Sequence, residues 1–140
     1  MRRIATVLVI IGLLAALAGA ASATPPRPAG KFRTVIAKPA NFVGPWWLTF
    51  GAHNAFAVYR GYVDTPHLGV RGSVSYSGNQ ITFTDASGPA ACTGAQASGV
   101  YSYTLPSATT LRLTKIRDDC VGRRTVLAGR LFTKPARKKN

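Results

Sequence analysis

The chain has 140 residues and carries 18 Lys or Arg against four acidic residues, a formal net charge of +14. All four acidic residues are aspartates, at positions 64, 85, 118 and 119, so the sequence offers few placements for the paired carboxyl groups that glycosidases use. The composition therefore argues against carboxylate-based hydrolysis and favours a strongly basic, non-enzymatic protein.

Residues 1–23 have the pattern of a secretory signal peptide. Arg2 and Arg3 supply a positive start, residues 4–21 are apolar or small, and Ala21-Ser22-Ala23 is a small-x-small cleavage pattern. A membrane anchor is the alternative, because the apolar run approaches spanning length. The small residues and the prolines that follow favour cleavage. We therefore expect a secreted, extracellular protein of 117 residues with net charge +12, a length that suits one domain.

Past the predicted cleavage point, residues 24–31 are rich in Pro and Gly and predict a flexible arm. Short runs then alternate apolar with polar or small residues, which is the period of two expected of strands with one face in a core. This alternation predicts strands over residues 32–36, 44–50, 55–61, 68–76, 80–84, 99–105, 109–116 and 124–132. One helical turn is expected within residues 38–43, where Pro39 suits a first helical position. Residues 134–140 form a basic tail.

Short strands at regular spacing, with no long helical segment, are typical of an antiparallel sandwich or barrel. A meander barrel also removes the exposed edges that a small sheet would present. We therefore predict an all-β fold over residues 32–133, an antiparallel up-and-down barrel of eight strands. The alternation points one apolar set inward: Trp46, Leu48, Phe50, Leu68, Val70, Val74, Tyr76, Ile81, Phe83, Leu111 and Leu113.

Cys92 and Cys120 are the two cysteines of the chain, and both lie in breaks between predicted strands. An exported protein meets an oxidising environment, so a disulfide is the natural interpretation, with two free thiols as the alternative. Closing a loop of 28 residues would stabilise the fold by about 3.5 kcal/mol in the chain-entropy account.

Four segments, taken in order, resemble a group of small secreted bacterial lipocalin-like, or calycin-like, proteins. They are FVGPWWLTF (42–50), ITFTDASGPAAC (81–92), GVYSY (99–103) and DDCVGRR (118–124). The resemblance covers about residues 32–132 and implies an up-and-down barrel with an apolar interior and a mouth lined by loops. In lipocalins the tryptophan of a Gly-x-Trp pair packs against an arginine near the last strand. The resemblance therefore implies structural roles for Gly44 and Trp46, and for either Arg123 or Arg124.

Catalytic and metal-binding patterns are weak. Asp118 and Asp119 are adjacent, so their side chains would point to opposite faces if extended, and a loop corner paired with Arg123 or Arg124 is the simpler interpretation. His53 and His67 lie in predicted turns, and no serine sits in a nucleophile elbow. No set of ligands has a recognisable metal spacing. We predict no enzymatic activity, no cofactor and no metal.

The predicted apolar interior is the main candidate for function. An eight-stranded barrel is just wide enough either to be filled by side chains or to hold one small ligand. Tyrosines are suitable liners because a phenol offers apolar area with a polar tip. The alternative is that they are ordinary core or surface residues. The expected ligand-binding residues for a small hydrophobic molecule are Phe50, Tyr59, Tyr76, Phe83, Tyr101 and Tyr103.

The charge supports a second class of partner. Basic residues of the tail and of several predicted outer strand faces would attract an anionic envelope polymer or lipid headgroups by salt-sensitive, long-range attraction. A solvated basic surface that aids solubility is the simpler alternative. No motif with base-reading residues appears, so we expect no specific nucleic acid partner, and we expect a monomer.

Overall fold

The computed structural model describes residues 23–62 and 66–136. The predicted signal peptide lies outside the described residues except for its last position, and so do Asp64 and residues 137–140 of the predicted basic tail. Within the described part of the chain, no helix is both long enough and apolar enough to cross a membrane.

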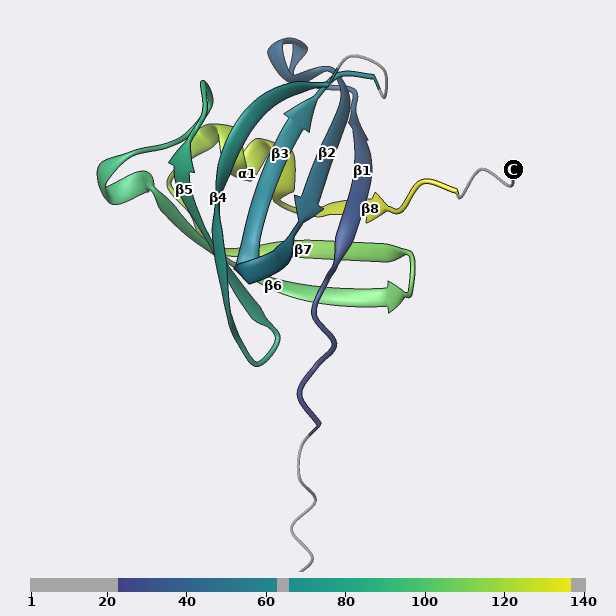
Figure 1. The fold of residues 1–140 in the computed structure, drawn as a ribbon. Helices are drawn as coiled ribbons and strands as arrows, with labels where there is room; N and C mark the ends of the chain where they lie inside the picture. Colours follow the sequence, from purple (N-terminus) through teal and green to yellow (C-terminus); the bar gives the residue numbers. More distant parts are fainter. Residues whose placement is uncertain (1–22, 63–65, 137–140) are drawn as a thin grey trace, which may run out of the picture.

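The described residues form eight antiparallel strands that close into a barrel in sequence order, as predicted (Figure 1). Each strand pairs with the next, and β1 closes the ring against β8, where Arg33 is opposite Thr133. The strands are β1 (Gly30–Ile36), β2 (Gly44–Phe50), β3 (Ala55–Arg60), β4 (His67–Ser77), β5 (Gln80–Ser87), β6 (Ser98–Ser107), β7 (Thr110–Arg117) and β8 (Arg130–Thr133). The expected turn before β2 is the 3-10 helix η1 (Ala40–Phe42).

The last predicted strand, over residues 124–132, is wrong in its first half. The chain forms helix α1 (Val121–Leu127) there, and β8 has only four residues. Arg123, Val126 and Leu127 are its buried residues, a spacing of three and four that turns one helical face to the core. The Cys120 sulfur accepts a hydrogen bond from the Arg123 N–H and so caps the first turn. Gly129, at a φ of 68°, then redirects the chain into β8.

Side chains fill the centre of the barrel. The Phe83 ring lies 5.1 Å from Phe56, 5.7 Å from Tyr101 and 6.2 Å from Phe50, measured between ring centroids. The predicted inward set is buried except for Tyr76, which is half-buried, and Leu68, for which the prediction is wrong. A register shift between Val58 and Tyr59 pairs Leu68 with Tyr59 and leaves it out of the core.

The two ends of the barrel differ. Tight hairpins join β2 to β3, β4 to β5 and β6 to β7 at one end, where η2 (Ala52–Asn54) also lies. Near it, Pro28 of the N-terminal arm is buried and the Arg27 guanidinium lies 4.7 Å from the Tyr76 ring centroid. At the other end lie η1, the segment 88–97 with η3 (Gly94–Gln96), and α1. The longer connections at this α1 end form the candidate site.

Candidate functional site

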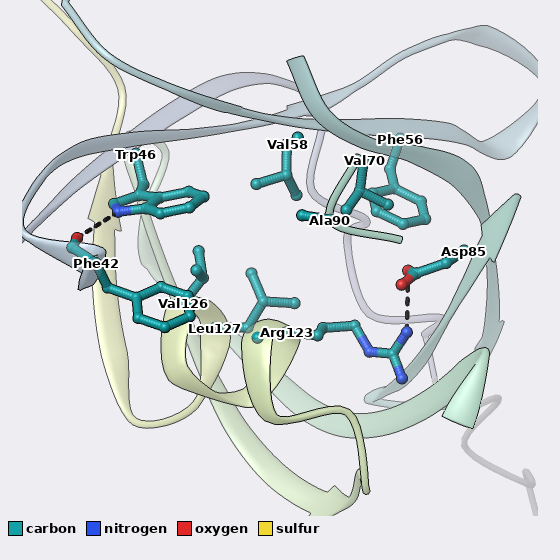
Figure 2. A pocket seen from close by; sticks show the side chains of 12 residues that line it. Phe42, Trp46, Phe56, Val58, Val70, Asp85, Ala90, Arg123, Val126 and Leu127 are labelled. Atoms are coloured by element: carbon teal, nitrogen blue, oxygen red, sulfur yellow. Dashed lines mark hydrogen bonds and ion pairs between the residues drawn. The ribbon is translucent and has the colours of Figure 1, made fainter. Parts of the chain in front are cut away.

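A half-open pocket of about 40 Å³ lies at the α1 end, between the helix and the wall formed by β2, β3 and β4 (Figure 2). Its lining is mostly apolar, with Asp85 and Arg123 together at one side. The lining residues are Phe42, Trp46, Phe56, Val58, Gly69, Val70, Asp85, Ala90, Gly122, Arg123, Val126 and Leu127. Because these residues come from five separate parts of the chain, the pocket exists only in the closed fold.

Trp46 forms the wall of the pocket farthest from the ion pair. Its indole N–H donates a 2.7 Å hydrogen bond to the carbonyl of Phe42, and the Phe42 ring stacks on it at 5.8 Å. The Arg60 guanidinium lies 5.5 Å from the Trp46 ring centroid and also donates a hydrogen bond to the Val43 carbonyl. The polar edge of the indole is therefore satisfied, and contacts with Phe42 and Arg60 hold its ring in place.

Arg123 holds the opposite wall together. Its side chain, 5% exposed, donates to both carboxylate oxygens of Asp118 at 2.8 Å, and its Nη1 lies 2.9 Å from Asp85 Oδ1. Among the described residues this Asp85 oxygen accepts no hydrogen bond, so its contact with Arg123 is an ion pair. The same guanidinium donates to the carbonyls of Gln96 and Ala97 at 2.9 and 2.8 Å. One cation thus ties α1 to β5, to the residue just after β7 and to the end of η3.

Tyr101 completes this buried network from inside the barrel, because its hydroxyl donates to Asp118. Burial, with the Asp118 carboxylate beside it, raises the pKa of Tyr101 far above its ordinary value, so the phenol stays protonated. Burial by itself would raise the pKa of Asp118. Hydrogen bonds from Arg123, Tyr101 and the Cys120 N–H outweigh it and lower that pKa. The charged, hydrogen-bonded network of Arg123, Asp85, Asp118 and Tyr101 is called the Arg123 brace below.

The lowered pKa of Asp118 predicts a loss of stability in acid. A group whose folded pKa is depressed stabilises the native state above its unfolded pKa, about 3.9, and this contribution disappears as the pH falls through the folded pKa. Urea unfolding of the wild type from pH 6 to pH 2 should show the loss below about pH 4. The Asp118→Asn variant should be less stable at pH 6 and flatter across this range. Parallel pH profiles for the two proteins would contradict the assignment.

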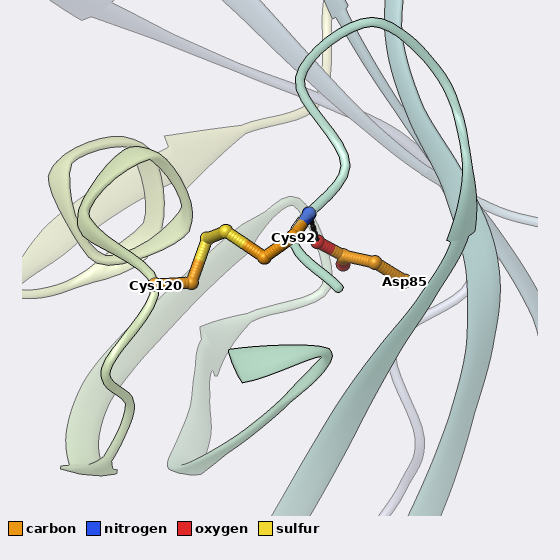
Figure 3. Close-up of side chains that lie close together, drawn as sticks. All are labelled: Asp85, Cys92 and Cys120. Carbon is orange, nitrogen blue, oxygen red and sulfur yellow. Dashed lines mark hydrogen bonds between the residues drawn. A yellow bond between two sulfur atoms is a disulfide. The ribbon is translucent and has the colours of Figure 1, made fainter. Parts of the chain in front are cut away.

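The predicted disulfide between Cys92 and Cys120 is present, with Cα atoms 6.0 Å apart (Figure 3). It ties segment 88–97 to the start of α1. The Cys92 N–H donates a 2.9 Å hydrogen bond to Asp85 Oδ2, so the crosslink and the Arg123 brace share a residue. Asp85 and the two sulfurs lie within 4.8 Å of one another, but oxidised sulfurs offer no thiolate to a metal.

Gly99 in β6 lies directly against the brace. A Cβ added there would come 2.5 Å from the Asp118 carboxyl carbon and 2.9 Å from Arg123 Nε. We expect Gly99→Ala to lower the free energy of unfolding by about 1–3 kcal/mol through this overpacking. In α1, a Cβ at Gly122 would meet nothing within 4 Å, so Gly122→Ala is the matched control and should be neutral or stabilising. Equal effects in urea unfolding would contradict the tight contact.

The residues predicted to bind a ligand are scattered. Phe83 and Tyr101 are fully buried at the centre of the core, and Tyr103 is buried with its ring 5.9 Å from Tyr76. Phe50 and Tyr76 line a second hollow of about 100 Å³ at the hairpin end, beside Arg27. Tyr59 lies on the outer face of β3. The structure brings Phe50, Phe83 and Tyr101 together as packed rings, and none of the six lines the pocket at the α1 end.

The structure also shows where the residues lie to which the resemblance assigns structural roles. Gly44 opens β2 at a φ of 118°, which favours glycine. Arg123 is buried at the pocket and Arg124 is only half-buried. Arg60, however, is the arginine that lies over the Trp46 ring. The Arg123 side chain lies at the other side of the pocket and points toward Asp85, away from Trp46 (Figure 2).

Sequence reasoning missed Val126 and Leu127 of the pocket because it read their segment as a strand. The spacing of Arg123, Val126 and Leu127 was the available signal for a helix. Phe42, Val58 and Ala90 carry no signal of a pocket in the sequence, since each is an ordinary apolar residue.

Comparison of the chain with protein-family models, with curated proteins and with solved structures gives no match.

Proposed function

We propose that this chain is a secreted, non-enzymatic binding protein of lipocalin-like architecture that holds a small hydrophobic ligand. The observation that carries the proposal is the apolar, half-open pocket between Trp46 and α1. The ligand site is the mouth of the barrel rather than its lumen, because side chains occupy the lumen.

The chemistry of the pocket supports binding over catalysis. Asp85 and Asp118 are both committed to Arg123, and Tyr101 is held protonated against Asp118. Groups that neutralise each other in this way supply neither a free base nor a nucleophile. The remaining walls are apolar. They favour an apolar ligand, because binding removes the hydrophobic surface of the ligand from water.

The volume limits the ligand. A water molecule needs about 10–15 Å³ of cavity volume, so the pocket of about 40 Å³ admits about three groups of that size. A short alkyl chain or a comparable group therefore fits inside, and the rest of a larger molecule would stay at the mouth near Ala90. The pocket is far smaller than the roughly 300–1,000 Å³ of sites for drug-sized ligands.

Trp46 supplies a built-in reporter for this binding. In a Trp47→Phe background, 1-bromopropane should quench Trp46 fluorescence with saturation at low concentration, because a bound bromine lies near the indole. The Ala90→Phe variant should abolish the saturable phase by blocking the mouth, since Ala90 is exposed and lines it. Ala95→Phe, at an exposed position of η3, is the matched control and should keep it. Quenching that is linear in all three proteins would rule out the pocket.

A further inference from the structure

The surface of this protein carries almost no negative charge among the described residues. Three aspartates are described, and two of them, Asp85 and Asp118, are buried against Arg123. Asp119 alone is exposed in that part of the chain. Most of its lysines and arginines are exposed or half-buried, so the outer faces of the barrel present cations with few anions to neutralise them.

One outer face combines these cations with a hollow. It runs across β1, β2, β3 and β4, which lie side by side in Figure 1. The hollow measures about 300 Å³ and is lined by Thr49, Gly51, Ala55, Phe56, Ala57, Tyr59, Arg71 and Gly72. The small outward side chains of β2 and β3 in this lining leave the hollow beside the larger side chains of Tyr59 and Arg71.

Register places Arg71 in the lining of this hollow and Lys31 one strand beyond the lining on the opposite side. Lys31 is opposite Thr49, Thr49 is opposite Ala57, and Ala57 is opposite Arg71. Neighbouring strands lie about 4.8 Å apart, so the backbones of Lys31 and Arg71 are about 14 Å apart when measured along the curved sheet. Both side chains are exposed, and Arg71 has no ion-pair partner among the described residues.

The neighbouring row of paired residues, in which Trp47 is opposite both Arg33 and Tyr59, holds the cations on the β1 side of the hollow. Trp47 points to the outer side, yet it is 2% exposed, and its indole N–H donates to the Gly61 carbonyl at 2.9 Å. Lys31 Nζ lies 4.6 Å from the Trp47 ring centroid and the Arg33 guanidinium lies 5.6 Å from it. A cation over an aromatic face keeps its N–H donors free for an anion while losing some conformational freedom. Trp47 therefore positions two cations beside the hollow.

We propose that this face, with Lys31, Arg33 and Arg71 around the hollow, binds an acidic polysaccharide whose sugar rings carry carboxylate groups. Arg71 pairs with a carboxylate in the bidentate manner of guanidinium groups. The hollow accepts a sugar ring against Ala57 and the half-exposed ring of Tyr59. The inference does not depend on the pocket at the α1 end.

The shape of the face separates this ligand from other polyanions. A flat lipid surface would leave the hollow empty. Proteins that bind single-stranded nucleic acids supply several aromatic faces on which successive bases stack. Both cations over Trp47 cover that ring, which leaves Tyr59 as the one partly exposed aromatic ring among the outward residues of β1–β4; Tyr62, just past β3, is exposed but is a single further ring.

The test is calorimetric titration of the purified protein with tetragalacturonate. Binding should weaken as salt rises, and the fully methyl-esterified tetramer should not bind, since it lacks the charge. Arg71→Gln should weaken binding about tenfold, as expected for a lost charge-assisted hydrogen bond. Ala57→Leu should do the same by filling the hollow at unchanged charge. Arg112→Gln, which removes an exposed cation from β7 outside this face, should change binding less than about twofold.

Three results would overturn the proposal. The first is no measurable binding of tetragalacturonate at low salt by a protein whose far-ultraviolet spectrum shows it folded. The second is equal weakening by Arg71→Gln and Arg112→Gln, which would mean attraction by net charge alone. The third is binding of tetraphosphate, of a short oligothymidylate or of anionic vesicles that is as tight as the binding of tetragalacturonate, or tighter, and that Ala57→Leu leaves unchanged. Such ligands would not use the hollow.

Discussion

Replacing Arg123 with Ala is expected to lower the free energy of unfolding by about 3–5 kcal/mol, because it leaves buried carboxylates without their cation. Asp85 and Asp118 both contact this one guanidinium. The change also removes the hydrogen bonds to the carbonyls of Gln96 and Ala97, which anchor the end of η3. Domains of this size are stable by about 5–15 kcal/mol in total, so the loss should be visible as a large shift of the urea midpoint.

Arg124→Ala is the matched control for this prediction. It removes the same side chain from the next position of α1, which is half-buried and makes no ion pair among the described residues. We expect a change below about 1 kcal/mol. Arg123→Lys should recover only part of the loss, because an ammonium group cannot serve two carboxylates and two carbonyls in the geometry of a guanidinium. Equal midpoints for Arg123→Ala and Arg124→Ala would refute the brace.

Removing the disulfide is expected to cost about 3.5 kcal/mol, the chain-entropy value for a loop of 28 residues. The double variant Cys92→Ser with Cys120→Ser isolates this effect. The Cys92 and Cys120 N–H groups donate to Asp85 and Asp118 from the backbone, and a serine hydroxyl can still cap α1 at position 120. Thermal and urea unfolding should both show the loss.

Hydrogen exchange separates the crosslink from a general effect on stability. In the double variant, amides of segment 88–97 should exchange faster than those of β2 and β3, since the disulfide joins that segment to α1. Labelling the unreduced, denatured wild type with a thiol reagent should modify neither cysteine. An unchanged urea midpoint in the double variant would contradict the expected contribution.

The barrel was predictable because the strands before α1 each carry their own signal of alternating apolar residues. Alternation in β2 points Trp46, Leu48 and Phe50 inward, and tight turns separate strands that pair with their sequence neighbours. The errors have physical causes. Leu68 left the core because an extra residue in β4 shifts its register, which periodicity cannot reveal. The segment 124–132 combines a short helix with a short strand, and its β-branched residues disguised the helical spacing.

The candidate site was less predictable than the fold. The disulfide followed from two cysteines in a chain predicted to be exported, and Arg123 was one of two arginines singled out by the resemblance. The sequence could not show that Arg123 would take Asp118 and Asp85 together, because Asp85 lies 38 positions away and meets it only in the closed barrel. Whether aromatic rings line a lumen or fill it depends on packing, and here Phe83 and Tyr101 fill it.

Methyl-resolved nuclear magnetic resonance during titration with 1-bromopropane tests the location of the ligand most directly. The pocket at the α1 end predicts saturable shifts of the methyl groups of Val58, Val70, Val126 and Leu127, which line it. Leu111 and Leu113, buried in the core but not in its lining, should stay unchanged. Shifts confined to Val74, which lies by the hollow at the hairpin end, or the absence of any saturable shift, would contradict the proposed binding site.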